Sequence, residues 1–127
     1  MIVLATRSFT VDQADVDAWA ELSTDFNPLH VDPEFALTTR FGGTIAHGHL
    51  TLSVMIGLVH EVCGNAWLTG GRIENVRFRG PVRPGREYEV RVLGSDAATA
   101  WRVEVTDADG TTVADGQARI ATLKPTP

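Results

Sequence analysis

The stretch AHGHLTLSVMIGLVHEV, residues 46–62, predicts the longest helix of the protein. Gly64 and Asn65 follow this stretch and are a typical stop signal for a helix. Apolar side chains would occupy almost every side of the helix: Leu50, Leu52, Val54, Met55, Ile56, Leu58, Val59 and Val62. A helix of this kind is buried on most of its sides, so we expect other elements to wrap around it.

The sequence after this helix alternates between apolar and polar residues with a period of two. Such alternation indicates antiparallel strands with one face toward solvent. We expect strands near residues 76–79, 87–92, 101–106 and 112–123, with turns near residues 84–85, 94–96 and 107–110. One buried helix and a run of antiparallel strands predict an α+β domain whose curved sheet wraps the helix. An open sheet edge also favours a dimer.

The residues before the long helix are interpreted as short helices and loops. Thr10 followed by Gln13 resembles a capping box and predicts a helix over residues 11–22. Residues 23–30 are rich in turn formers and are expected to form a loop. Pro33 is suited to the first turn of a second short helix that ends before the glycines at 42 and 43.

Length and composition predict one domain over residues 1–127. Hydrophobic residues make up 43% and charged residues 21%, as in ordinary soluble globular proteins. The net charge of -5 argues against a nucleic-acid-binding protein. Cys63 is the single cysteine, so no intramolecular disulfide is expected and a buried structural thiol is favoured. The sequence has neither a secretory signal nor an apolar run of membrane-spanning length, which favours the cytoplasm.

The expected loop at residues 23–30 brings together three side chains that can carry acid–base chemistry. The Asp25 carboxylate can take a proton from water, and the His30 imidazole can orient that water or deliver a proton. Asn27 can hold water or substrate by hydrogen bonds without titrating. The same residue types are common in loops of no catalytic function, and spacing alone leaves this alternative open.

A second group of residues, GGTIAHGH at 42–49, leads into the long helix. Free backbone N–H groups at a helix N-terminus stabilise an oxyanion, so Gly48 is a candidate donor; its alternative role is close packing. His47 and His49 lie two residues apart and would point to different sides of a helix, which argues against a metal site. We expect no metal and no other cofactor. Ser53 lacks the sequence context of a nucleophilic serine.

Several of these segments resemble the MaoC-like family of (R)-specific enoyl-CoA hydratases. The resemblance lies in DFNPLHVDP at 25–33, FG at 41–42 and IAHG at 45–48, and continues in FRGPVRPG at 78–85. It covers most of the chain. The family implies a single hotdog fold, in which a curved antiparallel sheet wraps a long helix, and this fold is usually dimeric.

The resemblance also implies an activity, the hydration of trans-2-enoyl-CoA to (R)-3-hydroxyacyl-CoA or the reverse dehydration, within fatty acid metabolism. It makes Asp25 and His30 the pair that holds the water, with Asn27 in support and the Gly48 N–H donating to the thioester oxygen. A further group is expected to contact substrate: Ser53, His47, His49, Leu52 and Ile56. His49 stands where the family commonly has Met or another apolar residue.

Three alternatives remain open beside the hydratase. A dehydratase acting on acyl carrier protein would need a basic docking patch, for which several arginines are available: Arg72, Arg77, Arg79, Arg83 and Arg86. The same arginines could bind the phosphates of CoA or form a solvated strand face. A hotdog thioesterase would attack the carbonyl carbon instead, and a non-catalytic acyl-binding subunit would need neither Asp25 nor His30. We expect an acyl thioester and a second copy of the chain as partners, but no nucleic acid and no membrane.

Overall fold

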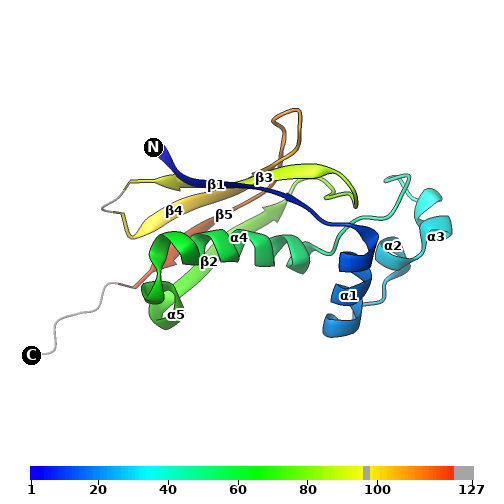
Figure 1. Cartoon of the computed structure of the whole chain (residues 1–127), viewed down its shortest axis with the longest axis horizontal. Coiled ribbons are helices and arrows are strands. Elements are labelled where there is room, and N and C mark those ends of the chain that lie inside the picture. Colours follow the sequence, from blue (N-terminus) through cyan, green and yellow to red (C-terminus); the bar gives the residue numbers. More distant parts are fainter. Residues whose placement is uncertain (96–97, 122–127) are drawn as a thin grey trace, which may run out of the picture.

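The computed structural model of the protein describes residues 1–95 and 98–121. Its elements follow one another as β1 (Ile2–Thr10), α1 (Gln13–Ser23), α2 (Pro28–Val31), α3 (Pro33–Leu37), α4 (Gly48–Cys63), α5 (Asn65–Gly70), β2 (Gly71–Phe78), β3 (Glu87–Gly94), β4 (Ala100–Thr106) and β5 (Thr112–Ile120). The five strands form one antiparallel sheet in the order β1-β3-β4-β5-β2, which leaves β1 and β2 at its edges. Helix α4 runs along one face of this sheet, and α1, α2 and α3 gather beyond one of its ends (Figure 1).

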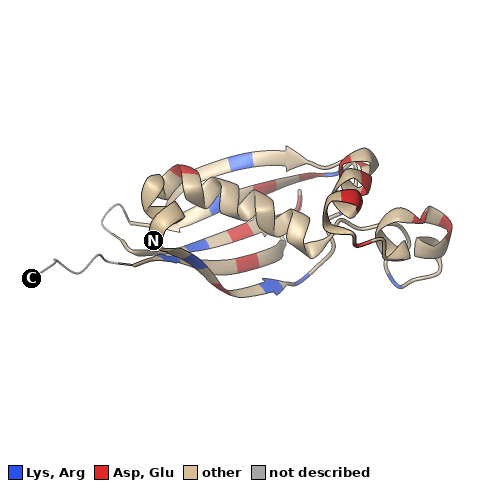
Figure 2. Ribbon diagram, turned by 90° about the horizontal axis from the view of Figure 1, so that it is seen from below, with Lys and Arg blue, Asp and Glu red and all other residues tan. Residues whose placement is uncertain are grey.

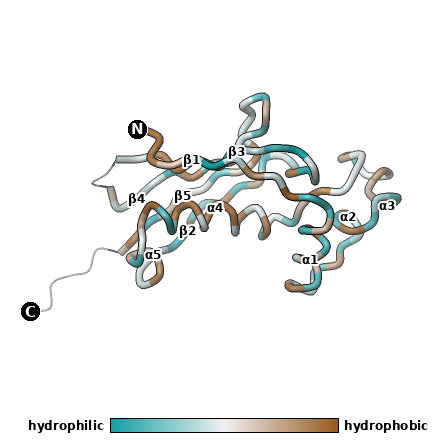
Figure 3. The backbone as a smooth tube through the Cα atoms, viewed as in Figure 1, coloured by the Kyte–Doolittle hydropathy of each residue, from teal (hydrophilic) through white to brown (hydrophobic). Residues whose placement is uncertain are grey.

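Helix α4 is the predicted long helix, but it is buried on one side and not on most of its sides, because it packs on one face of the sheet and leaves Ser53, Gly57 and Glu61 exposed. Met55 and Val59 are completely buried in it and share one apolar core with Val90 and Val103 of the sheet. The helix is among the most hydrophobic segments of the chain in the hydropathy colouring of Figure 3. It begins at Gly48, two residues later than predicted, because the backbone of His47 is extended.

The sheet confirms the predicted alternation on its inner face and departs from it on its outer face. Tyr88, Val90 and Val92 of β3 are buried as predicted. However, Glu104 and Asp115 on the opposite face are also buried, at 7% and 4% exposure. Arginines cover these carboxylates: Arg79, just after β2, pairs with Asp115, and Arg102 of β4 pairs with Glu104. Charged residues of both signs lie side by side on the sheet (Figure 2). The outer face of the sheet is therefore not uniformly exposed to solvent.

The N-terminal region departs furthest from the prediction. Residues 2–10 form the edge strand β1, which pairs with β3, where no strand was expected. The alternation is weak here because most of the strand is exposed and its register shifts between Val3 and Ala5. The capping box of α1 is formed by Asp12 and Asp15, so the proposed pair of Thr10 and Gln13 is wrong.

The connecting segments are more helical than predicted. The expected loop at residues 23–30 ends in the short helix α2, while α3 begins at Pro33 as predicted. Gly64 ends α4 as expected, but with φ of 63° it turns the chain directly into α5, which was not predicted. Strand β5 ends at Ile120; residues 122–123 of its predicted range, and residue 96 of a predicted turn, lie outside the described residues. In the described part of the chain, every helix is too short or too polar to cross a membrane.

Candidate active site

The segment between α1 and α2 places Asp25 and His30 on the same side of a tight turn. Thr24 ends α1 with a left-handed φ of 61°. The Asp25 carboxylate then accepts the Asn27 N–H at 3.2 Å, and the Asn27 side-chain oxygen accepts the Leu29 N–H at 3.0 Å and caps α2. Side chains of this type favour such turns because they bond backbone N–H groups two residues ahead. The five positions between Asp25 and His30 are therefore spanned by one compact turn.

The ring of His30 is held in one orientation by backbone groups of the next segment. Its Nδ1 lies 2.8 Å from the carbonyl oxygen of Ile45. Because a carbonyl can only accept, Nδ1 carries the hydrogen, and Nε2 of the neutral ring is left as an acceptor. Gln13 reinforces the junction, since its amide donates to the His30 carbonyl at 2.8 Å and accepts from the Thr44 hydroxyl at 2.7 Å. An imidazole acceptor is thereby presented beside Asp25.

His47 lies against this pair from the buried side. It is 2% exposed, and its ring stacks on that of His30 with the centroids 4.0 Å apart and the planes inclined by 26°. Its Nε2 donates to the carbonyl oxygen of Asp25 at 2.9 Å. One ligand atom from each of Asp25, His30 and His47 lies within 4.8 Å of the other two. The three side chains form one cluster, called the Asp25–His30–His47 cluster below.

Gly48 begins helix α4 immediately after this cluster. The N–H groups of the first turn of a helix have no partners inside the helix, so the Gly48 N–H is available to a ligand. A Cβ atom added at Gly48 would lie 3.0 Å from the Phe78 ring, so the close-packing interpretation of this glycine is also supported. Packing and donation are compatible, because the packing contact is made at the Cα position and the donor is the backbone N–H.

The remaining predicted substrate contacts lie along α4, outside the cluster. Ser53 is exposed and its hydroxyl donates to the Leu50 carbonyl at 2.7 Å, while His49 is also exposed. Leu52 and Ile56 are half-buried. Among the described residues, no hydrogen bond joins any of these side chains to Asp25 or His30. Their expected contact with an acyl chain remains a prediction.

Two residues that position the site were missed in the sequence. Gln13 lies in α1 and was assigned to a capping box, and Thr44 lies in the glycine-rich segment without any expected role. Their mutual bond connects residues 31 positions apart, and Gln13 also bonds His30 across 17 positions. Neither separation leaves a periodic pattern in the sequence, so only the folded structure reveals these two hydrogen bonds of Gln13.

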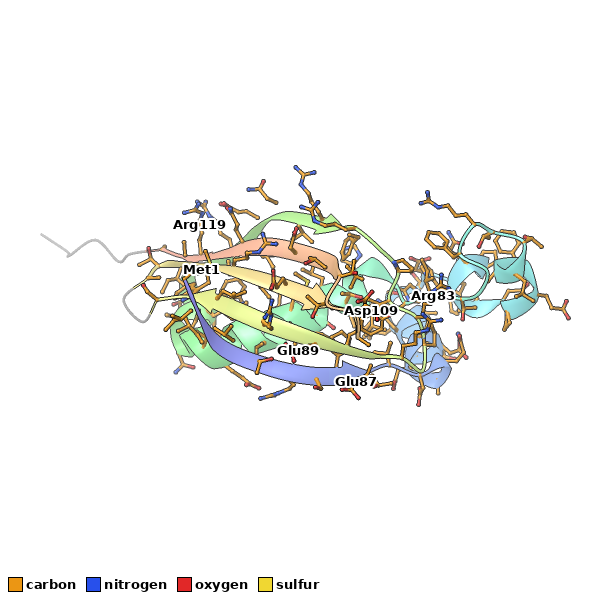
Figure 4. All side chains as sticks on the ribbon, turned by 90° about the horizontal axis from the view of Figure 1, so that it is seen from above. Met1, Arg83, Glu87, Glu89, Asp109 and Arg119 are labelled. Carbon is orange, nitrogen blue, oxygen red and sulfur yellow. The ribbon has the colours of Figure 1, made fainter. Side chains whose placement is uncertain are left out.

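The predicted basic group is divided by the fold. Arg72 pairs with Glu74, and Arg79 pairs with Asp115. Arg83 and Arg86, together with Arg79, line a cavity of about 410 Å³ at one end of the sheet. In Figure 4, Arg83 lies at the end of the sheet nearest the N-terminal helices, while Arg119 lies at the opposite end. The guanidinium of Arg83 reaches to 3.8 Å from a Cβ position built on Gly43, on the segment that leads to the cluster.

Comparisons with known proteins agree with this architecture. The family described as MaoC like domain matches residues 2–117. The (R)-specific enoyl-CoA hydratase of Aeromonas caviae is 42% identical over 92 residues, covering 68% of this chain and 67% of that protein. The 3-hydroxybutyryl-CoA dehydratase of Methylorubrum extorquens is 38% identical over 85 residues, covering 65% of this chain and 52% of that protein. The alignments thus span between half and two thirds of these relatives.

The solved structure of the (R)-hydratase from A. caviae involved in PHA biosynthesis superposes with a TM-score of 0.70 and 31% identity, covering 92% of this chain and 93% of that one. This likeness extends over both the sheet and the N-terminal helices. It confirms the predicted α+β hotdog fold.

Proposed function

Because the chain belongs to the MaoC-like domain family, we propose that it hydrates trans-2-enoyl-CoA to (R)-3-hydroxyacyl-CoA, or catalyses the reverse dehydration. The observation that carries this proposal is the pairing of an exposed Asp25 carboxylate with a His30 ring whose Nδ1–H is held by the Ile45 carbonyl. The names of the relatives, a hydratase and a dehydratase, describe the two directions of one reaction.

The reaction adds water across the C2–C3 double bond and needs no oxidant or reductant. Asp25 and the Nε2 of His30 each accept a hydrogen bond from one water molecule, which holds its lone pair toward C3. As the water oxygen bonds to C3, Asp25 takes a proton and electrons move from the double bond to the thioester oxygen. The Gly48 N–H stabilises that developing charge. The proton then passes to C2, the carbonyl re-forms and Asp25 is ionised again.

An assay with purified protein tests this proposal directly. Trans-2-enoyl-CoA substrates of short, medium and long chain are followed by loss of the ultraviolet absorbance of the conjugated thioester. Chiral chromatography of the hydrolysed product is expected to give the (R)-3-hydroxy acid. Absence of hydration at every chain length, or an (S) product, would contradict the assignment. Release of free thiol from a saturated acyl-CoA would instead support the thioesterase.

The carrier of the acyl group is proposed to be CoA. Arg83 and Arg86 make no ion pair within the described residues, so both can meet a phosphate at the end of the sheet next to the site. Turnover of matched enoyl thioesters on CoA and on acyl carrier protein separates the two carriers. A higher kcat/KM on the carrier protein would favour the dehydratase alternative. We place the activity in fatty acid metabolism of the cytoplasm, which cell fractionation with an activity assay would test.

We also propose a homodimer formed through the edge of strand β2. Along one edge β2 pairs with β5, and along its other edge no strand lies beside it within the described residues. Phe78 at the end of this strand is 52% exposed although it touches the start of α4. Such an edge is a surface for pairing with a second copy. Light scattering at micromolar concentration is expected to give twice the chain mass, and a monomer would contradict the proposal.

A further inference from the structure

His47 has three unusual features in one buried side chain. It donates from Nε2 to the Asp25 carbonyl, it stacks on His30, and its Nδ1 is buried with no hydrogen-bond partner among the described residues. At 2% exposure the ring offers almost no surface to a substrate. We propose that His47 is a positioning residue that acts through Asp25 and His30, a role that rests on the proposed hydration.

The bond to the Asp25 carbonyl fixes the backbone that carries the general base. Asp25 is exposed, and the hydrogen bonds of its carboxylate and N–H join it to residues of its own turn, Ser23 and Asn27. The contact with His47 is different, because it spans 22 residues and comes from the segment that leads into the rigid helix α4. Without it, and within the described residues, the hydrogen bonds of Asp25 itself would all lie within its own turn. His47 thus relates the position of Asp25 to that of the Gly48 N–H.

The stacking contact fixes the second member of the pair. The Nδ1–H of His30 bonds to Ile45, which sets one point of the ring, and the His47 ring then sets its plane. Ile45 and His47 lie two residues apart on the irregular segment that precedes α4. The segment at residues 45–48 therefore supplies three groups to the site. The Ile45 carbonyl bonds His30, the His47 ring contacts both His30 and Asp25, and the Gly48 N–H is the proposed donor to the thioester.

The unpartnered Nδ1 distinguishes this role from ordinary packing. Because Nε2 carries the hydrogen donated to Asp25, Nδ1 is a bare acceptor, and a buried acceptor without a donor destabilises the folded protein. An apolar ring of similar size would avoid that penalty. A histidine at this position is therefore better explained by the position it imposes on Asp25 and His30 than by stability.

Two variants separate the donor from the ring. His47→Phe keeps a stacking ring and removes both nitrogens; His47→Gln keeps an N–H donor and removes the ring. We expect His47→Phe to lower kcat at least tenfold with KM within twofold of wild type and with an unchanged or higher melting temperature. His47→Gln should recover a substantial part of kcat, because a donor to Asp25 is restored. The matched control is His60→Phe, in the last turn of α4 and outside the cluster, which should leave kcat unchanged.

A spectroscopic readout makes the test independent of turnover. Long-range ¹H–¹⁵N correlation of the imidazole nitrogens is expected to show His30 as a pure Nδ1–H tautomer in wild type and in His47→Phe, which keeps the stacking ring, and as a mixture of tautomers in His47→Gln, which lacks it. If wild type hydrates no enoyl-CoA, the proposed function fails while the tautomer result still tests the positioning. A kcat within threefold of wild type in folded His47→Phe would overturn the inference, and so would a rise in KM as large as the fall in kcat. An unchanged His30 tautomer in folded His47→Gln would overturn it as well.

Discussion

Polar side chains differ in their burial and pairing between the Asp25–His30–His47 cluster and the outer face of the sheet. On that face Arg79, Arg91, Arg102, Glu104 and Asp115 form an ion-pair network. Each buried carboxylate meets two guanidiniums, as when Asp115 accepts from Arg79 at 2.8 Å and from Arg102 at 3.0 Å. In the cluster, by contrast, the Asp25 carboxylate is exposed and His47 Nδ1 has no partner in the described part of the chain.

This difference separates groups that hold the fold from groups that do chemistry. Burial opposes ionisation of Asp115, but the hydrogen bond and charge of Arg79, aided by Arg102, outweigh it and hold the pKa of that carboxyl below its usual value. The hydrogen bond to Glu104 likewise raises the pKa of Arg102. Both carboxylates of the network are paired with two guanidiniums, so neither is free to act as a base, although the buried Nε of Arg91 has no hydrogen-bond partner among the described residues. The cluster keeps acceptors free, so it can take up water.

The largest expected effect is at Asp25 and His30. Asp25→Asn keeps the shape and removes the base, whereas His30→Ala removes the water ligand. Each should lower the hydration rate by about a hundredfold to ten-thousandfold, the range for loss of general acid–base catalysis. Thermal unfolding should change little, because Asp25 is exposed and His30 is only half-buried. Steady-state kinetics and calorimetry on the same preparations check both statements.

The double variant tests whether the two residues act as a unit. Groups that hold one water together are not additive, so the double variant should be little slower than the slower single variant. Purely multiplicative losses would argue for two independent roles. Hydration within a few-fold of wild type in either folded single variant would end the assignment of this pair.

Gly48→Ala is expected to have the next largest effect. The added methyl group would contact the Phe78 ring at 3.0 Å and occupy space at the start of α4 where the thioester oxygen must approach. Loss of one oxyanion donor lowers kcat by about a hundredfold or more. The Phe78 ring is half-exposed and can move aside, so stability should fall much less than activity. A proportional loss of stability and rate would show that Gly48 serves packing alone.

The sequence predicts the chemistry of the site better than its geometry. Asp25, Asn27 and His30 are close in the chain and their turn follows from local rules, so their convergence could be anticipated. The contribution of His47 could not, because its bond to Asp25 spans 22 residues and depends on how the segment before α4 folds back. The same holds for Gln13 and Thr44. Long-range hydrogen bonds leave no periodic signal in the chain.

The fold shows the same division. Helix α4 was predicted because it is a long segment with apolar residues on almost every side, and strand β3 because burial of one face imposes a period of two. Strand β1 was missed because an exposed edge strand is held by backbone pairing with β3, to which the side chains contribute little pattern. The buried position of Glu104 was missed for another reason: its charge suggests exposure to solvent, and its burial depends on the ion pairs with Arg91 of β3 and Arg102 of its own strand.

A smaller effect, on stability alone, is expected for Asp115→Asn. The carboxylate is 4% exposed and bonds two arginines, but both of these are near half exposure and water can replace part of the interaction. We expect the free energy of unfolding to fall by about 1–2 kcal/mol, as for loss of a partly screened charged hydrogen bond. Hydration activity should stay within twofold of wild type. A tenfold loss of kcat in the folded variant would show that the ion-pair network also contributes to catalysis, as the cluster does.

The pH dependence of the same variant has a definite sign. The pKa of Asp115 is lowered in the folded protein, so the folded state binds fewer protons than the unfolded chain in the acid range. Its stabilising contribution is complete above the ordinary aspartate pKa of about 3.9 and is lost as pH falls toward the lower folded value. The stability difference between wild type and Asp115→Asn should therefore shrink below about pH 4. Chemical denaturation at several pH values measures it.

The smallest effect is expected at the exposed pair of Arg7 on β1 and Glu61 on α4. Two hydrogen bonds of 2.6 and 2.8 Å join these side chains, a geometry at least as close as that around Asp115. However, the two side chains are 58% and 51% exposed, so water and salt compete for both charges. Glu61→Gln should change the free energy of unfolding by less than about 0.5 kcal/mol, and added salt should reduce that difference further. An effect as large as that of Asp115→Asn would show that bond geometry, and not burial, sets the energy of these ion pairs. The buried network would then stabilise the fold no more than an exposed ion pair does.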